Sequence, residues 1–302
     1  MMKDLQALLG PARVPFLTLP PVVTLLGLGA AIWRADGHIH YWYFLPALIG
    51  ALAAHISVNA LNEYHDYKTG LDELTRRTPF SGGSGTLQAR PDLAEKALWL
   101  GVISALITLL IGAFFLWRWG WGILPLGVLG LLVVIAYTPL LTHNPLACLI
   151  APGLGFGLLM VMGTDYVLTG SYSLTAFWAS LTPFFLVNDL LLLNQFPDVE
   201  ADKQVGRRHY PMVIGQEKSA LLYGVQLALA YLAIVIGVIL GYLPPLTLLG
   251  LLTIIIAIPT YRGVRVHAND MENLLPFMGK NVLINLATPL LMAAGLIIAT
   301  FL

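Results

Sequence analysis

Charge is scarce in this 302-residue chain: only 11% of its residues are Asp, Glu, Lys or Arg, and 58% are hydrophobic. A water-soluble domain carries about 25% charged residues, so the composition excludes an ordinary soluble enzyme and indicates a protein that crosses a membrane several times. The 16 cations balance the 16 anions. Without a positive excess nothing indicates a surface for nucleic acid, and we expect no nucleic-acid partner.

Cysteine is almost absent as well. Cys148 stands alone in the chain, which excludes an intrachain disulfide and a cysteine metal cage. Its apolar neighbours predict a small buried side chain. No secretory cleavage pattern accompanies the first apolar run, residues 14–33, and we interpret that run as a membrane helix.

Nine apolar runs reach spanning length. Alternation with a period of two is missing from them, so helices are the expected spanning form. The predicted spans are 14–33, 41–63, 97–117, 121–140, 146–164, 173–196, 219–240, 243–261 and 281–301. We therefore predict an all-α membrane protein with nine transmembrane helices, forming a single domain over residues 1–302.

The distribution of Lys and Arg predicts the orientation. The N-terminal segment and the connections 64–96, 197–218 and 262–280 hold 14 of the 16 cations, Lys3 and Arg76 among them, and the other side holds two. Because cytoplasmic loops carry the excess of cations, we expect the N-terminus and these connections in the cytoplasm. The protein is then a multi-pass protein of the cell membrane.

The few charges concentrate at two places, and the first follows the second predicted span. Its residues are Asn62, Asp66, Lys68, Gly70 and Asp72. On a helix, His55, Asn59, Asn62 and Asp66 share one narrow stripe. A charge at bilayer depth costs at least ~2.5–3.5 kcal/mol, so the stripe is expected to face a cavity or the bundle interior. A polar stripe that only joins helices is the alternative.

The same spacing, Asn-x-x-x-Asp, returns 132 residues later, after the sixth predicted span. This second motif consists of Asn194, Asp198 and Asp202, followed by Gly206, Arg207 and Arg208. Pro197 lies either inside a continuing helix or in the first turn of a new one. Four predicted spans separate the motifs, so both face the same side. Carboxylates mixed with cations favour Mg²⁺ carrying a phosphorylated ligand.

Three weaker candidates remain. The glycine- and serine-rich stretch 78–85 either cradles phosphate through backbone N–H groups or is a flexible loop. Asn188 and Asp189 lie deep in the sixth span, where an acid is a functional candidate; it is either protonated and hydrogen-bonded or part of an acceptor pocket. His55 is more typical of a hydrogen-bonded interior histidine than of a ligand.

At these motifs the chain resembles the UbiA superfamily of intramembrane prenyltransferases. The spacing Asn62-x3-Asp66-x3-Gly70-x-Asp72 looks like the branch that prenylates 1,4-dihydroxy-2-naphthoate for menaquinone, and unlike the 4-hydroxybenzoate branch. Four features depart from the family pattern: Glu63, Pro197, His209 and the stretch 80–84.

The resemblance implies a nine-helix bundle around a central cavity, with the two motifs in the loops after spans two and six. It implies Mg²⁺-dependent transfer of an isoprenyl group from a diphosphate to an aromatic or other small acceptor, with membrane lipid around the prenyl tail. The implied metal ligands are Asp66, Asp72, Asp198 and Asp202, with Asn62 and Asn194 orienting them. The implied diphosphate-binding cations are Lys68, Arg77, Arg207 and Arg208, and Tyr64 or Tyr67 would shield the allylic cation.

Three alternatives stay open. Two are enzymes of the same superfamily, a membrane terpene cyclase and a lipid-ether prenyltransferase. The third is a cation-coupled transporter. The position of both motifs at helix ends argues against transport, because transport sites lie near the bilayer midplane.

Overall fold

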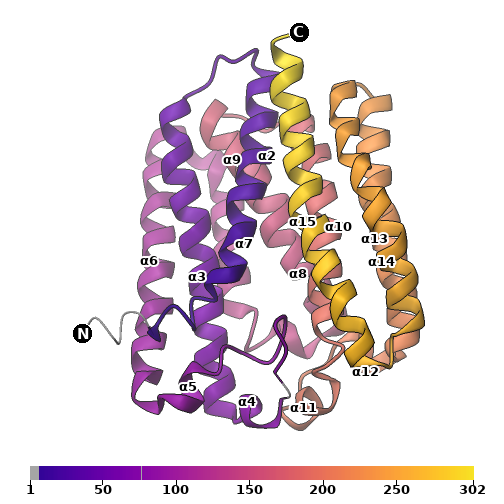
Figure 1. The fold of residues 1–302 in the computed structure, drawn as a ribbon. Helices are drawn as coiled ribbons and strands as arrows, with labels where there is room; N and C mark the ends of the chain where they lie inside the picture. The colour runs from indigo at the N-terminus through magenta and orange to yellow at the C-terminus, as the bar shows by residue number, and fades with distance from the viewer. Residues whose placement is uncertain (1–6, 76) are drawn as a thin grey trace.

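The computed structural model describes residues 7–75 and 77–302, so the predictions made for Lys3 and Arg76 lie outside the described residues. Every regular element in this part of the chain is helical (Figure 1). The all-α prediction is confirmed. Eight stretches of the described residues are long and apolar enough to cross a membrane.

Long helices form the body of the bundle. They are α2 (Leu19–Arg34), α3 (Phe44–Thr69), α6 (Ala94–Trp119), α7 (Leu124–Ala136), α10 (Leu174–Asn194), α13 (Gln216–Ile239), α14 (Ile254–Val266) and α15 (Met271–Thr300). A kinked helix completes it: α8 (Pro145–Gly153) continues through a π-helical segment, Leu154–Leu159, into α9 (Met160–Thr169). The short helices are α4 (Leu71–Leu74), α5 (Thr86–Ala89), α11 (Val199–Gln204) and α12 (Tyr210–Ile214).

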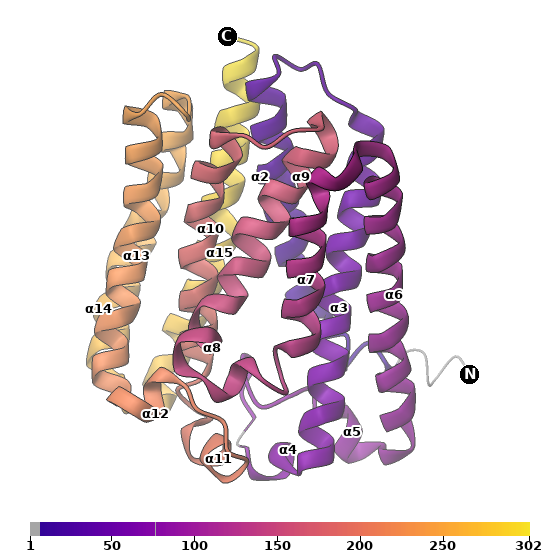
Figure 2. The ribbon, with the colours of Figure 1, turned by 180° about the vertical axis from the view of Figure 1, so that it is seen from behind.

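The number of spans depends on α6 and α7, which belong to one apolar stretch of 46 residues, Pro91–Ala136. Gly120 has φ 74°, and the chain reverses there, so that α7 runs back beside α6 (Figure 2). The 13 residues of α7 extend only about 20 Å, which is less than the ~30 Å hydrocarbon core of a bilayer. Nine spans therefore remain a prediction.

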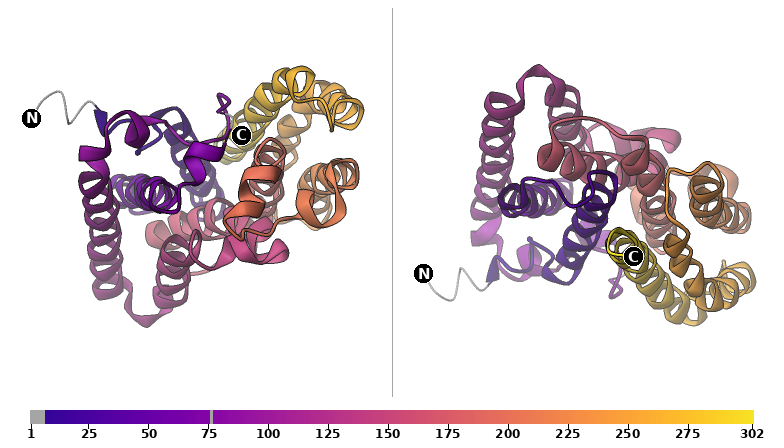
Figure 3. Two further views of the ribbon diagram at one scale, coloured as in Figure 1. Left: turned by 90° about the horizontal axis from the view of Figure 1, so that it is seen from below. Right: turned by 90° about the horizontal axis from the view of Figure 1, so that it is seen from above.

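All the short helices gather at one end of the bundle, the lower end in Figure 1. They follow α3 and α10 directly, so this end also carries both Asn/Asp motifs. Views along the helices (Figure 3) show the first part of the chain on one side of the molecule and the last third on the other. The site is thus assembled where two distant parts of the chain meet.

The kinked helix reaches α10 through glycine. A Cβ atom on Gly153 would lie 2.1 Å from the carbonyl oxygen of Phe184, and one on Gly157 would lie 2.4 Å from the amide nitrogen of Phe184. Such contacts are possible only without a side chain, so these two glycines permit the close approach of the kinked helix to α10. Asn188 on α10 accepts a hydrogen bond from the Gly153 amide at 2.7 Å.

An ion pair joins α2 to α9 at the opposite end. Arg34 Nε lies 2.8 Å from Asp165 Oδ1, and Ser173 Oγ donates to Asp165 Oδ2 at 2.9 Å. Asp165 is only 1% exposed. A carboxylate this deep is stable because both of its oxygens are bonded.

We predict that Gly157→Ala destabilises the bundle by about 1–3 kcal/mol, because the added methyl group overpacks the contact with α10. Alanine in a helix is otherwise better than glycine by about 0.5–1 kcal/mol. Gly163→Ala is the matched control, since nothing lies within 4 Å of its Cβ position. Thermal unfolding in detergent measures both; equal unfolding midpoints for the two variants would contradict the predicted contact.

Candidate active site

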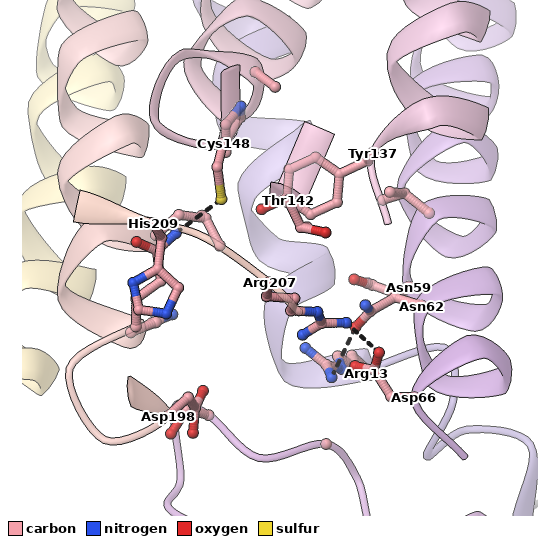
Figure 4. A pocket seen from close by; sticks show the side chains of 18 of the residues that line it. Arg13, Asn59, Asn62, Asp66, Tyr137, Thr142, Cys148, Asp198, Arg207 and His209 are labelled. Atoms are coloured by element: carbon pink, nitrogen blue, oxygen red, sulfur yellow. Dashed lines mark hydrogen bonds and ion pairs between the residues drawn. The ribbon is translucent and has the colours of Figure 1, made fainter. Parts of the chain in front are cut away.

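One cavity opens among the short helices, and both motifs line it. All six predicted motif residues are in its wall: Asn62, Asp66, Asp72, Asn194, Asp198 and Asp202. Other parts of the wall come from α3, α7, the kinked helix, the stretch 80–83 and single residues such as Arg13, Arg207 and His209, the last three of which are labelled in Figure 4. The motifs therefore face one another across a shared space, as the even number of predicted spans between them requires.

Helix α3 presents the first motif without interruption. His55, Asn59, Asn62 and Asp66 all line the cavity, which confirms the predicted polar stripe. The helix ends at Gly70, whose φ of 74° is left-handed and so suits glycine. The turn lets α4 bring Asp72 back to the cavity, where its side chain is buried like that of Asp66.

The second motif crosses a helix boundary. Helix α10 ends at Asn194, and α11 begins at Val199, directly after Asp198. Pro197 therefore lies in the turn between them. Helix α11 then places Asp202 one turn after Asp198, with the Asp202 amide donating to the Asp198 carbonyl at 2.8 Å.

Arg207 connects the two motifs. Its Nη2 forms an ion pair with Asp66, and its Nη1 lies 3.3 Å from Asp202 Oδ1. Burial opposes the charge of this guanidinium, but the two adjacent carboxylates outweigh burial and raise the pKa of Arg207 above its usual value. Among the four predicted ligand-binding cations, this one lines the cavity.

The other three do not. Lys68, Arg77 and Arg208 are exposed and absent from the cavity wall. The ammonium of Lys68 lies over the ring of Tyr64 at 5.5 Å, and Arg77 donates to Gln88 at 2.9 Å. The structure gives their predicted contact with a ligand no support. Spacing along the chain brings a cation near the motif but does not say which way its side chain points.

Among the described residues, two cavity carboxyls have no cation paired with them. Burial, reinforced by the charge of Asp202, raises the pKa of Asp198 to about 7, and Asp198 Oδ1 is buried without a hydrogen-bond partner among the described residues. Burial also raises the pKa of Asp72 to about 6, although Gln88 donates a hydrogen bond to it at 2.7 Å. Both carboxyls are thus placed to gain from a cation that enters the cavity.

The donor set fits Mg²⁺. Carboxylate oxygens are its preferred protein ligands, and Mg²⁺ usually takes one or two of them while water and phosphate oxygens complete the shell. In residues 7–75 and 77–302 no three His, Cys, Asp or Glu side chains converge as a metal site. A Mg²⁺ ion held here would therefore take few protein oxygens and complete its shell with water or with oxygens of a bound ligand.

Two of the cavity residues were missed by the sequence prediction. Arg13 lines the cavity, and its Nε lies 2.9 Å from Glu63 Oε1. His209 lines it too, with Nε2 3.0 Å from Asp202 Oδ2. The sequence carried a signal for each of them. His209 departs from the family pattern, and so does Glu63, the partner of Arg13. Arg13 itself is a charge next to an apolar run.

Aromatic side chains in the wall also differ from those predicted. Tyr64 and Tyr67 are not in the wall, whereas Phe80, Tyr137 and Phe156 are. The glycine-rich stretch does border the cavity: a Cβ on Gly83 would lie 2.7 Å from Asp72 Oδ1, and its φ of 71° is left-handed. Glycine therefore allows this backbone to approach the carboxylate.

Deeper in the bundle the wall becomes apolar. It is formed there by Val58, Val133, Val134, Pro152, Met160 and Leu191. Asn188 and Asp189 are fully buried outside the wall, and Asp189 accepts from Gln226 at 3.2 Å, so the structure gives them no part in a pocket for an acceptor. His55, predicted to be hydrogen-bonded, has instead an unpartnered Nδ1 among the described residues and an edge-on contact with Phe156.

Known proteins resemble this chain along most of its length. The profile of the UbiA prenyltransferase family matches residues 22–281. The chain is 27% identical over 289 residues to 1,4-dihydroxy-2-naphthoate octaprenyltransferase of Bacillus subtilis strain 168, covering 94% of this chain and 90% of that protein. It is 25% identical over 198 residues to digeranylgeranylglyceryl phosphate synthase of Pyrococcus furiosus, covering 62% of this chain and 63% of that protein.

Solved structures share the fold. A UbiA homolog from Aeropyrum pernix K1 superposes with a TM-score of 0.69 at 18% identity, over 93% of this chain and 97% of that one. A UbiA homolog from Archaeoglobus fulgidus bound to DMAPP and Mg²⁺ gives a TM-score of 0.57 at 14% identity, over 97% of both chains. Profile, relatives and fold agree that the chain belongs to the UbiA prenyltransferase family and is a multi-pass membrane prenyltransferase.

Proposed function

We propose that this protein transfers an isoprenyl group from an isoprenyl diphosphate to 1,4-dihydroxy-2-naphthoate or a closely related aromatic acceptor, with Mg²⁺ and release of diphosphate. The observation that carries the proposal is the single cavity with four aspartates from two motifs at one end and an apolar wall beyond them. The diphosphate head of an isoprenyl diphosphate matches the aspartate end of the cavity, and its hydrocarbon tail matches the apolar wall.

Asp66 and Asp72 from the first motif, and Asp198 and Asp202 from the second, would hold two Mg²⁺ ions. Bound there, the metal supplies charge that neutralises the diphosphate and makes it a better leaving group. The homolog bound to DMAPP and Mg²⁺ supports this assignment.

The chain's own residues orient the head group. Arg207 already lies between Asp66 and Asp202, where its guanidinium can donate to diphosphate oxygens in a bidentate arrangement. Asn62 donates to Thr138 at 3.2 Å, and this contact fixes its amide in the cavity wall. Asn194 sits at the matching position of the second motif and lines the opposite side.

The apolar part of the wall protects the reactive carbon. Tyr137 and Phe156 can shield an allylic cation by cation–π contact, worth ~0.5–2 kcal/mol. The valines and Met160 around them exclude water, which would otherwise capture the cation. The ring of the acceptor would then supply the electron pair for the new carbon–carbon bond and restore its aromaticity by losing a proton, or its carboxylate as CO₂, from the same carbon, while diphosphate leaves with the electrons of the broken C–O bond.

The choice of acceptor rests on the motif spacing and on the match along 94% of the chain to a naphthoate octaprenyltransferase. A glyceryl lipid acceptor is the second candidate, because the digeranylgeranylglyceryl phosphate synthase match covers 62% of the chain. We propose the aromatic acceptor, since the cavity wall contains the aromatic side chains that stack on a ring.

Replacing Asp66 or Asp198 by Asn should lower Mg²⁺-dependent release of diphosphate from farnesyl or geranylgeranyl diphosphate at least ~100-fold, because each change removes a charge that stabilises the transition state. Glu200→Gln is the matched control: this acid lies on α11 but is exposed and pairs with Lys203 at the surface. Rates like wild type in either aspartate variant would refute the proposed metal site.

Acceptor selectivity gives a second test. Purified protein with Mg²⁺ and geranylgeranyl diphosphate should prenylate 1,4-dihydroxy-2-naphthoate faster than 4-hydroxybenzoate or geranylgeranylglyceryl phosphate. Mass spectrometry of the lipid extract measures all three products. A faster reaction with the glyceryl lipid would assign the chain to ether-lipid synthesis, and a cyclised hydrocarbon formed without an acceptor would show a terpene cyclase.

We also propose that the cavity opens on the cytoplasmic side of the cell membrane, because the connections at that end carry most of the cations. A membrane-impermeant maleimide should label His38→Cys, at the opposite end, in intact cells, and should label Glu200→Cys only after lysis. The native Cys148 is 3% exposed, so the wild type serves as the unlabelled control. Labelling of Glu200→Cys in intact cells would reverse the orientation.

A further inference from the structure

Glu63 is a charged residue that the proposed chemistry does not use, yet it adjoins the first motif. We infer that Glu63 is a positioning residue that holds Arg13 at the cavity as a second diphosphate-binding guanidinium and ties the glycine-rich loop to the same point. The inference rests on the proposed function, because it assumes that a diphosphate occupies the cavity.

Glu63 has no exposed surface, and it does not line the cavity although its neighbour Asn62 does. Its Oε1 accepts from Arg13 Nε at 2.9 Å and from the Ser84 amide at 2.7 Å, and its Oε2 accepts from Ser84 Oγ at 2.8 Å. A buried carboxylate is tolerated when charge and hydrogen bonds surround it in this way. Both partners come from segments outside α3.

Arg13 is held from three sides. Besides Glu63, Asn62 accepts from Arg13 Nη2 at 3.4 Å, and the Asn59 side chain donates to the Ala12 carbonyl at 3.3 Å. The Arg13 backbone has φ 51° and ψ 54°, a left-handed conformation that is uncommon for a residue with a side chain. Such a conformation persists where several contacts determine it, and it is found at ligand-binding positions.

The attachment leaves part of the guanidinium for the cavity. Glu63 takes the Nε–H, while Nη2 lies 3.4 Å from Asn62 Oδ1 in the wall; Arg13 and Asn62 are labelled in Figure 4. Of the described residues, four carboxylates and two guanidiniums, Arg13 and Arg207, line the space. Without Glu63, the cavity carboxylates would form ion pairs with Arg13. The ion pair with Glu63 therefore keeps the Arg13 guanidinium separate from those carboxylates. A phosphate oxygen can then accept from the terminal N–H groups.

The hydrogen bonds between Ser84 and Glu63 also fix the position of the glycine-rich loop. The loop residues just before Ser84, Ser81 to Gly83, line the cavity. The N-terminal segment packs on the loop as well, since a Cβ on Gly10 would lie 2.0 Å from Thr86 Oγ1. One carboxylate therefore sets the relative positions of the N-terminal segment, the first motif and the loop that covers Asp72.

Steady-state kinetics with farnesyl diphosphate, Mg²⁺ and a saturating aromatic acceptor test the inference in Glu63→Gln, Arg13→Lys and the double variant. Each single change should raise KM for farnesyl diphosphate about tenfold or more, the scale of one charge-assisted hydrogen bond, with a smaller change in kcat. The double variant should be no worse than the worse single variant, because both changes break one contact. Lys203→Gln, an exposed cation outside the cavity, is the control and should leave KM unchanged.

Multiplying effects in the double variant, or a fall in kcat at constant KM, would overturn the inference. Ser84→Ala keeps every charge and serves if Glu63→Gln does not fold: it should raise KM by a smaller factor, and an unchanged KM would count against the role of Glu63. Thermal stabilisation of the wild type by Mg²⁺ with inorganic diphosphate tests the proposed function separately. Wild-type protein that neither binds this probe nor consumes farnesyl diphosphate would overturn the function itself.

Discussion

The ion pairs of Arg207 with Asp66 and Asp202 are the contact on which this site depends. The pair with Asp66 joins residues 141 positions apart in the chain, and it brings a loop after α10 against the end of α3. In an apolar bundle an unpaired charge is expensive, so this pairing both permits the acids to be buried and fixes where the two motifs meet. The bundle supplies the apolar walls, and the buried charges determine the register of its two halves at this end.

Several features of the site were predictable from the sequence for a physical reason. The stripe His55, Asn59, Asn62 and Asp66 follows from helical periodicity, and it lines the cavity as expected. The left-handed turn at Gly70 follows from the freedom of glycine. Apolar runs are predictable because hydrophobic length is a local property: the described residues hold eight apolar stretches, one of which, Pro91–Ala136, takes the place of the predicted runs 97–117 and 121–140. The even number of predicted spans between the motifs placed both on one side, and the aspartates of both line the same cavity there.

The rest depended on contacts that no local pattern encodes. Lys68, Arg77 and Arg208 are near the motifs in sequence, but they reach solvent, where a flexible cation is well hydrated. Arg13 lies 50 residues from Glu63 and binds it nonetheless. Whether α6 and α7 form two spans depends on how α7 packs, since one cation, Arg118 in the last turn of α6, is the charge that marks the turn at Gly120. The position of these cations, the partner of Arg13 and the number of spans depend on side-chain direction and tertiary contacts, which composition does not encode.

Buried acids in this bundle show why burial alone does not identify a site. Asp165 is almost fully buried, but Arg34 and Ser173 satisfy it far from the cavity. Asp189 is more deeply buried still and accepts from Gln226 outside the cavity wall. Asp198 differs from both because it faces the cavity: its unpartnered Oδ1 can meet a ligand there, whereas the unpartnered Oδ2 of Asp189 lies outside the wall, each judged among the described residues. An acid that lacks a partner where a ligand can enter is stabilised by that ligand. Binding of a cation and its diphosphate relieves the free-energy cost of burying the unpartnered carboxyl, and this gain contributes to their binding energy.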